Sequence, residues 1–227
     1  MANFQEAYEL TMGDEGGYVN NPNDKGGPTY KGIAKNFWGY LSLWRRIEQI
    51  LAKVGAEPPF DSKPNSPYRS FVKKANKALQ DDSQLQNEIL SFYKKNFWTI
   101  HRLGEINNQK IANWIFNHVV NGGGQGIKWV QLAVGVVVDG AIGPKTITAI
   151  NSYDPDRLFT KLKEIASIYR IEKVEKDGSQ INFLPSWLRR DGATEEEMNE
   201  VFKVIKDGRL TQQEVAFLKQ TFTSNVG

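Results

Sequence analysis

Apolar residues recur at helical spacing from the start of the chain. Residues 4–12 place their apolar side chains on one side of a helix, and Asn3 stands at the N-cap position with Glu6 three residues later. Helices commonly end at glycine, and the first glycines here are Gly13 and the pair at 16–17. We therefore expect a first helix that follows Asn3 and ends at one of these glycines.

The same spacing predicts helices along most of the chain, while strand signals are few. The expected helices cover 38–54, 67–80, 82–97, 106–121, a segment from about 127, and 155–176. Four prolines within 56–67 mark an exposed connector, because proline interrupts regular structure. Near the end, capping boxes predict two more helices, and they pair Thr194 with Glu197 and Thr211 with Glu214. The expected fold class is all-α with a small β-hairpin.

Composition is that of an ordinary globular protein. Of 227 residues, 40% are apolar and 24% charged, and no apolar run approaches the roughly 18 residues of a membrane helix. The chain has no cysteine, and its two histidines, His101 and His118, form no ligand pair, so we expect no metal site. A net charge of +3 is too small to indicate a nucleic-acid partner, but it suits approach to a polyanionic surface such as a bacterial wall polymer.

Candidate chemistry lies in the stretch GDEGGYVNNPNDKGGPTYKGIA, residues 13–34, which carries Glu15 and Asp24 nine positions apart. A carboxylate at a helix C-terminus faces the negative end of the helix dipole, which favours its protonated form and suits Glu15 to act as a general acid. The glycine-rich segment that follows predicts a hairpin or Ω-like loop that returns Asp24 towards Glu15. Glycoside hydrolysis uses such a pair of carboxyl groups. Thr29 and Tyr30, on the returning strand, could then orient a water or a sugar hydroxyl.

The same residues also fit a simpler interpretation, since Glu followed by Gly-Gly is common at helix ends and Asn, Asp, Pro and Gly are common in turns. Spacing alone does not choose between the two. Tryptophans 98, 114 and 129 could stack on sugars, but large aromatic residues at helical spacing predict core positions.

The segment EGGYVNNPNDKGGPTYKGI, residues 15–33, closely resembles the signature of the glycoside hydrolase 108 family, a family of N-acetylmuramidases. Residues 111–151, with the run LAVGVVVDGAIGPKT, resemble the peptidoglycan-binding second half of that family. The resemblance covers about 4–38 and 88–190. It implies a lysozyme-like fold and carries the essential catalytic glutamate over onto Glu15.

The resemblance also implies a domain organisation. A lysozyme-like catalytic part is expected over 1–118, a peptidoglycan-binding helical part packed on it over 119–190, and a helical tail over 191–227. Residues 39–87 are expected to be a helical insertion in the catalytic part. Because neither this insertion nor the tail contains motif residues, we expect both to concern partners and regulation rather than chemistry.

Together these observations predict a lysozyme that cleaves the β-1,4 bond between N-acetylmuramic acid and N-acetylglucosamine. Glu15 is the expected general acid and Asp24 the candidate second carboxylate, with no cofactor, because the chemistry is proton transfer with electrostatic support. The residues expected to contact the substrate are Tyr18, Asn20, Thr29, Tyr30, Asn117 and Asn121. The expected partner is the peptidoglycan glycan strand, bound by a monomer.

Two other functions remain open from the sequence. A lytic transglycosylase also needs one acidic glutamate, and a non-catalytic wall-binding or secretion-accessory protein would use mainly residues 119–190. The N-terminus lacks the basic and apolar regions of a secretory signal. We therefore expect synthesis in the cytoplasm and action on the cell wall after release through a holin-like pore or another route.

Overall fold

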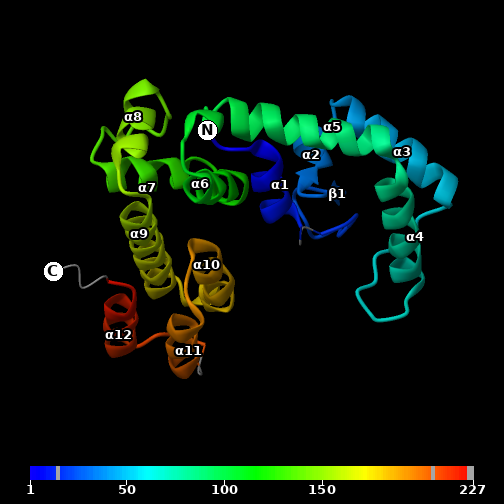
Figure 1. Cartoon of the computed structure of the whole chain (residues 1–227). Helices are drawn as coiled ribbons and strands as arrows, with labels where there is room; N and C mark the ends of the chain where they lie inside the picture. The colour runs from blue at the N-terminus through cyan, green and yellow to red at the C-terminus, as the bar shows by residue number, and fades with distance from the viewer. Residues whose placement is uncertain (14–15, 206–207, 224–227) are drawn as a thin grey trace. The chain divides into compact units, whose positions relative to one another are not determined.

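The computed structural model describes residues 1–13, 16–205 and 208–223. They form an all-α fold with one small antiparallel hairpin, which confirms the fold class expected from the sequence (Figure 1). Its α-helices and strands are α1 (Phe4–Met12), β1 (Thr29–Tyr30), β2 (Ile33–Ala34), α2 (Lys35–Trp38), α3 (Ser42–Val54), α4 (Pro67–Asp81), α5 (Ser83–Tyr93), α6 (Gln109–Gly122), α7 (Gly124–Val134), α8 (Pro144–Ser152), α9 (Pro155–Lys176), α10 (Leu184–Asp191), α11 (Glu195–Val204) and α12 (Gln212–Phe222). A π-helix, η1 (Lys94–Thr99), and two 3₁₀ helices, η2 (Leu103–Glu105) and η3 (Gly178–Phe183), complete the set.

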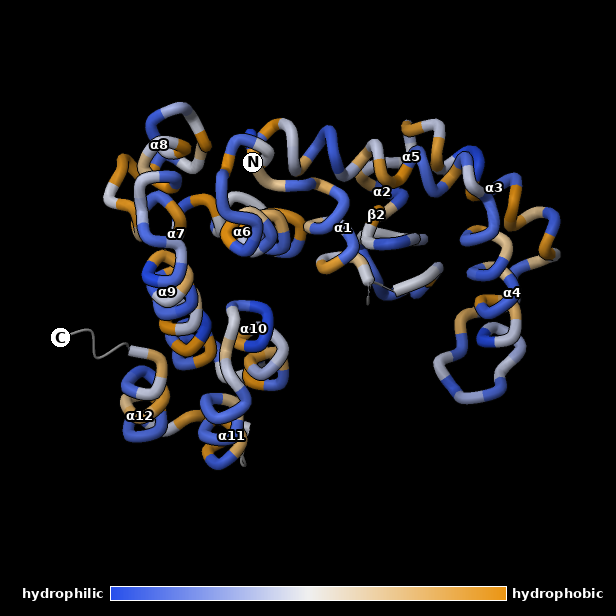
Figure 2. The backbone as a smooth tube through the Cα atoms, in the orientation of Figure 1, coloured by the Kyte–Doolittle hydropathy of each residue, from blue (hydrophilic) through white to orange (hydrophobic). Residues whose placement is uncertain are grey.

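The chain divides into two compact units, residues 8–96 and residues 1–7 with 97–227. In the first unit, α3 packs against α4 and α5. Hydrophobic and hydrophilic residues alternate along these helices (Figure 2). The largest fully buried side chains on these three helices are those of Trp44, Ile47, Leu79, Leu85 and Ile89. Asp82 strengthens this packing, because its carboxylate caps α5 at Leu85 and receives two hydrogen bonds from Arg46 of α3, at 2.6 and 2.9 Å.

The second unit is built around α9, which packs against α6, α7, α10 and α12. Its core includes Trp98, Trp114 and Trp129, each at most 5% exposed, so the expectation that these tryptophans are core residues is confirmed. Both predicted capping boxes are present, at Thr194 and at Thr211. They begin α11 and α12, whose apolar faces join those of α9 and α10 in one buried cluster.

Of the capping box predicted at Asn3 and Glu6, only the bond to the Asn3 side chain forms. Asn3 caps α1 as expected, since its Oδ1 accepts from the Gln5 N–H at 2.8 Å. The reciprocal bond from Glu6 is absent, because the Asn3 N–H donates to Gln109 Oε1 at 2.5 Å instead. Glu6 accepts a hydrogen bond from Asn113 at 3.4 Å. A long-range partner on α6 thus replaces the local one.

Two segments that were each expected to form one helix form two successive elements in the structure. The helix expected over 38–54 is α2 followed by α3, separated at Gly39, Tyr40 and the extended residue Leu41. The helix expected over 82–97 is α-helical only to Tyr93 and continues as the π-helix η1. Residues from 38–43 and from the start of η1 line the same groove.

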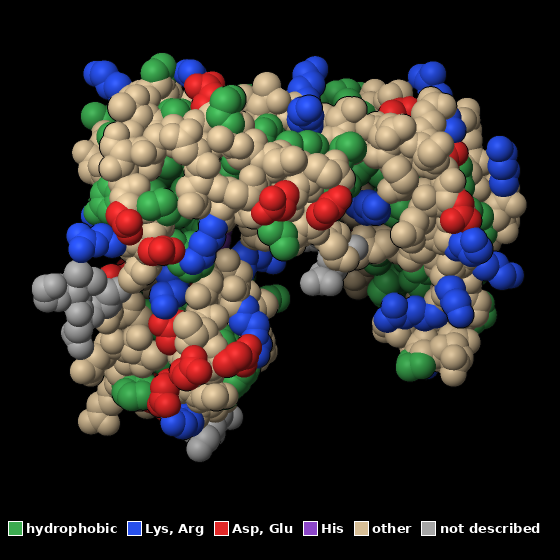
Figure 3. Space-filling view, viewed as in Figure 1, with side chains coloured by type: hydrophobic (Ala, Val, Ile, Leu, Met, Phe, Trp, Pro, Cys, Tyr) green, Lys and Arg blue, Asp and Glu red, His purple; other side chains and the backbone are tan. Residues whose placement is uncertain are grey.

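Surface charge agrees with the scattered distribution in the sequence. On the face shown in Figure 3, Lys and Arg side chains are spread over both units rather than gathered in one basic patch. Of the helices in the described ranges, none has the length and hydropathy of a bilayer-spanning segment.

Candidate active site

The glycine-rich stretch folds into a returning hairpin, as predicted. β1 and β2 pair with Tyr30 opposite Ile33, and the turn between them has positive φ at both Lys31 (45°) and Gly32 (74°), which is the geometry of a tight type I′ turn. Before the hairpin, Val19 bridges Thr29 through two backbone hydrogen bonds of 2.9 and 2.8 Å. The returning strand therefore lies beside the residues that follow Glu15 in sequence.

Asp24 lies in the loop between Val19 and Thr29 and is exposed. Its Oδ1 accepts a hydrogen bond from the Gly26 N–H at 2.8 Å, and its backbone carbonyl accepts from the Gly27 N–H at 3.0 Å. Among the described residues, its second carboxylate oxygen has no hydrogen-bond partner. The loop thus fixes the carboxyl group through one oxygen.

Helix α2 holds this loop from the other side. The Asn36 N–H donates to the Gly26 carbonyl at 3.0 Å, and the Asn36 side chain donates to the Lys25 carbonyl at 2.9 Å. Gly27 adopts a φ of +67°, and a Cβ there would lie 2.8 Å from Asn36 Oδ1, so the position requires glycine on both grounds. Sequence reasoning missed Asn36 as a positioning residue, because its role depends on a contact across the loop.

Glu15 lies outside the described residues. The structure therefore gives no distance between Glu15 and Asp24. The neighbouring helix end is described: α1 ends at Met12, and the Gly13 N–H donates to the Glu9 carbonyl at 2.8 Å. The helix thus ends just before Gly13, one of the glycines expected to end it, and the role of Glu15 stays a prediction.

Tyr18 is buried, with 4% of its surface exposed. Its N–H donates to Asn76 Oδ1 at 2.6 Å and its hydroxyl donates to Glu57 Oε2 at 2.9 Å. Burial, followed by the bond to Glu57, raises the pKa of Tyr18 far above the usual range for a phenol. Asn20 is anchored as well, because its N–H donates to the hydroxyl of Tyr68 at 2.7 Å. Both residues are thus tied to the protein through α4 and the connector before it.

These contacts correct one expectation. Residues 39–87 were expected to concern partners and regulation rather than chemistry. Yet Asn76 and Tyr68 accept hydrogen bonds from backbone N–H groups of the motif, and Glu57 accepts one from the Tyr18 hydroxyl. The packing is close, because a Cβ on Gly17 would lie 2.3 Å from the Asn76 side chain. The second glycine of the motif is therefore explained by the approach of α4, which no local sequence signal reveals.

Thr29 and Tyr30 support the hairpin. The Thr29 hydroxyl donates to the Gly27 carbonyl at 3.1 Å. Tyr30 is 2% exposed and its hydroxyl accepts from Gln86 Nε2 at 3.3 Å, while burial raises its pKa. The structure shows packing and hydrogen-bonding roles for both residues, and their contact with substrate stays a prediction.

Asn117 and Asn121 lie on α6, within the unit that begins at residue 97. Asn121 Nδ2 donates to the Asn117 carbonyl at 3.0 Å, and the side-chain oxygen of Asn117 is buried without a partner among the described residues. Their position is defined within that unit alone, so the structure does not test whether they join the hairpin residues at one site.

Comparisons with known proteins define the class of this chain. The sequence model described as glycosyl hydrolase 108 matches residues 8–123, and one described as predicted peptidoglycan domain matches residues 125–192. The chain is therefore a glycoside hydrolase directed at peptidoglycan. It belongs to the glycosyl hydrolase 108 family, and the resemblance drawn from the motif is confirmed. The matched range includes residues 39–87, in agreement with their contacts to the motif.

A solved structure supports the fold. The chain is similar to a protein described as SagA from Brucella abortus, with a TM-score of 0.52 and 21% sequence identity over 90% of this chain and 96% of that one. The lysozyme-like fold class is confirmed. No curated protein matches this chain.

Proposed function

We propose that this protein is a lysozyme that cleaves the β-1,4 bond between N-acetylmuramic acid and N-acetylglucosamine. Glu15 acts as the general acid that protonates the leaving oxygen. Asp24 acts as the second carboxylate, either activating a water or stabilising the cationic transition state. The observation that carries this proposal is the loop between Val19 and Thr29, which leads into the hairpin and fixes Asp24, nine positions after Glu15, through one oxygen.

Several features of the hairpin favour this chemistry. Asp24 is exposed on the loop, where a sugar chain can reach it, and its geometry is set by backbone hydrogen bonds rather than by a flexible partner. Gly26 and Gly27 leave little side-chain bulk near the carboxylate. The Glu15–Asp24 separation decides the stereochemistry, since about 5 Å implies retention and roughly 6.5–9.5 Å leaves room for an inverting water.

The test of the bond and the outcome is product analysis of digested cell wall. Mass spectrometry of the fragments should show reducing N-acetylmuramic acid ends. Reducing N-acetylglucosamine ends would contradict the proposed bond. Anhydro-muramic ends would instead identify a lytic transglycosylase, in which the sugar's own hydroxyl replaces water.

The domain organisation supports action at the wall. We propose that the segment expected over 119–190, most of which lies in the range matching a predicted peptidoglycan domain, holds the enzyme on its substrate while the hairpin performs the reaction. In the part expected to be a helical tail, residues 191–227, α12 packs on α9. The route by which the protein reaches the wall stays a prediction from the sequence.

A further inference from the structure

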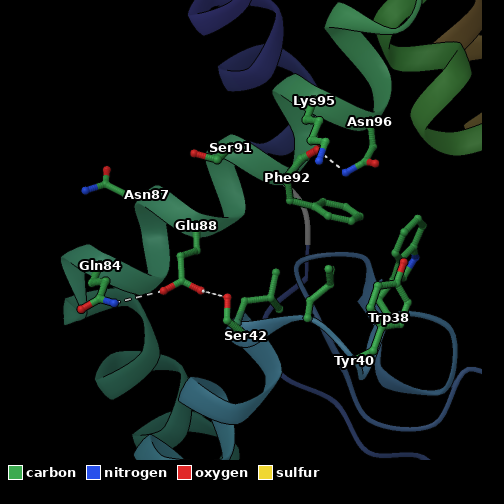
Figure 4. Close-up of a pocket in the computed structure, with 12 residues that line it drawn as sticks. Trp38, Tyr40, Ser42, Gln84, Asn87, Glu88, Ser91, Phe92, Lys95 and Asn96 are labelled. Atoms are coloured by element: carbon green, nitrogen blue, oxygen red, sulfur yellow. Dashed lines mark hydrogen bonds between the residues drawn. The ribbon is translucent and has the colours of Figure 1, made fainter.

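Within the 8–96 unit, a groove of about 530 Å³ lies between residues 38–43 and one side of α5 (Figure 4). This volume falls inside the roughly 300–1,000 Å³ typical of small-molecule sites. The groove is separate from the Asp24 loop, since no residue of 16–34 lines it. The function described above makes no use of it.

One side of the groove is aromatic. Trp38 and Tyr40 lie with ring centroids 6.2 Å apart, and Trp38 meets the buried ring of Phe92 edge-on at 4.9 Å. Tyr40 is 77% exposed, which is unusual for a ring of this size and is not explained by packing. The groove therefore offers an aromatic face that is supported from behind and open in front.

The other side is polar. Glu88 accepts hydrogen bonds from Ser42 at 2.9 Å and Gln84 at 3.2 Å, which joins α5 to the start of α3. Asn87, Ser91 and Lys95 follow one another at four-residue spacing, which places them along one side of the helix. In the described ranges, none of these three side chains has a hydrogen-bond or ion-pair partner. They supply an amide, a hydroxyl and an ammonium group to a ligand.

The groove adjoins α2, the helix that is bonded to the Asp24 loop. Trp38 is the last residue of α2, and Asn36 in the same short helix binds the Asp24 loop through two hydrogen bonds. A ligand that lies along α2 can therefore contact both the loop and the groove. The substrate of a wall hydrolase is a polymer long enough to do so.

We propose that this groove binds sugar units of the glycan strand beyond the cleaved bond, with a ring stacked on Trp38 and Tyr40 and Lys95 facing the carboxylate of an N-acetylmuramic acid. The inference rests on the proposed function for its choice of ligand. A pyranose ring presents an apolar C–H face and a rim of hydroxyl and acetamido groups, and the groove matches them with aromatic rings and with hydroxyl and amide side chains. An apolar peptide would leave these polar groups unpaired.

The experiment measures binding of two soluble tetrasaccharides by calorimetry. One alternates N-acetylglucosamine with peptide-free N-acetylmuramic acid, and the other is chitotetraose, which has no carboxylate. Every protein carries Glu15→Gln, so that the ligands stay intact. Tyr40→Ala should weaken binding of both ligands about five- to tenfold, the usual effect of removing one aromatic contact. Lys95→Ala should weaken binding of the muramic ligand only, about threefold.

Matched controls are Phe202→Ala, another exposed aromatic residue that lies on α11, and Lys74→Ala, an exposed lysine on α4. Both should leave both affinities unchanged, and melting curves should show that all variants fold. If Tyr40→Ala binds both ligands as tightly as the parent protein, or if the parent protein binds neither, the proposal that the groove binds sugar units is wrong. If Lys95→Ala weakens binding of both ligands equally, the proposed contact between Lys95 and the carboxylate of N-acetylmuramic acid is wrong. Lytic activity retained by Glu15→Gln would count against the proposed reaction but not against the binding result.

Discussion

His118 Nε2 lies 2.9 Å from Asp191 Oδ1, and both side chains are buried. The other ring nitrogen, Nδ1, lies 2.7 Å from the carbonyl oxygen of Trp114. Both ring nitrogens of His118 therefore face oxygen atoms, one of the backbone and one of a buried carboxyl group. Arg170 Nε lies 3.5 Å from the second oxygen of Asp191. This buried charge cluster joins α6, in the range of the hydrolase family, to α9 and α10, in the range of the peptidoglycan domain.

Asp191→Asn should lower the free energy of unfolding by about 3–5 kcal/mol, because it removes the buried carboxylate that faces Arg170 and His118. Urea denaturation measures the change. Asp156→Asn, at a highly exposed position on α9, is the control and should cost no more than about 0.5 kcal/mol. Equal stability of the two variants would show that the cluster does not stabilise the fold.

Gly17→Ala should destabilise the protein by about 1–3 kcal/mol, because the new Cβ would meet the Asn76 side chain. Gly16→Ala is the matched control, since a Cβ at that position has no atom within 4 Å. Adding Asn76→Ala to Gly17→Ala should recover part of the loss, and thermal unfolding would measure this non-additivity. Equal costs for Gly16→Ala and Gly17→Ala would contradict the close approach of α4.

Asp24→Asn should reduce wall hydrolysis about 10²-fold while leaving thermal stability unchanged. The asparagine side-chain oxygen can still accept from the Gly26 N–H, so the loop keeps its shape but loses its negative charge. Asp24→Ala removes both the charge and this hydrogen bond, and should lower stability as well as activity. If Asp24→Asn retains full activity, Asp24 only shapes the loop.

Stability should fall as pH rises above 10. Burial, followed by the nearby Tyr30, raises the pKa of Tyr8 from 10.0 to about 12. Between these values the unfolded chain loses the phenolic proton and the folded protein keeps it, so the contribution is complete below pH 10 and is lost on the way to pH 12. Chemical denaturation at pH 9, 10 and 11 should show this slope, reduced in Tyr8→Phe by up to about 1.4 kcal/mol per pH unit. An unchanged slope in Tyr8→Phe would contradict this assignment.

The sequence predicted most helices because their apolar periodicity and caps are local. Thr194 and Thr211 show this, since each capping bond spans only three residues. The site was predictable only in part. Asn36 and Asn76 fix the motif through partners far along the chain, and no spacing rule connects Asn76 with Tyr18. The groove was missed for the same reason, because it forms only where residues 38–43 meet α5.

The measurement that tests the central claim most directly is the rate of sugar release from isolated cell walls by Glu15→Gln. This substitution nearly preserves the shape of the side chain but removes its acidic proton. The rate should fall about 10²- to 10⁴-fold, with an unchanged far-UV spectrum and melting temperature. A rate close to that of the parent protein would contradict general acid catalysis by Glu15.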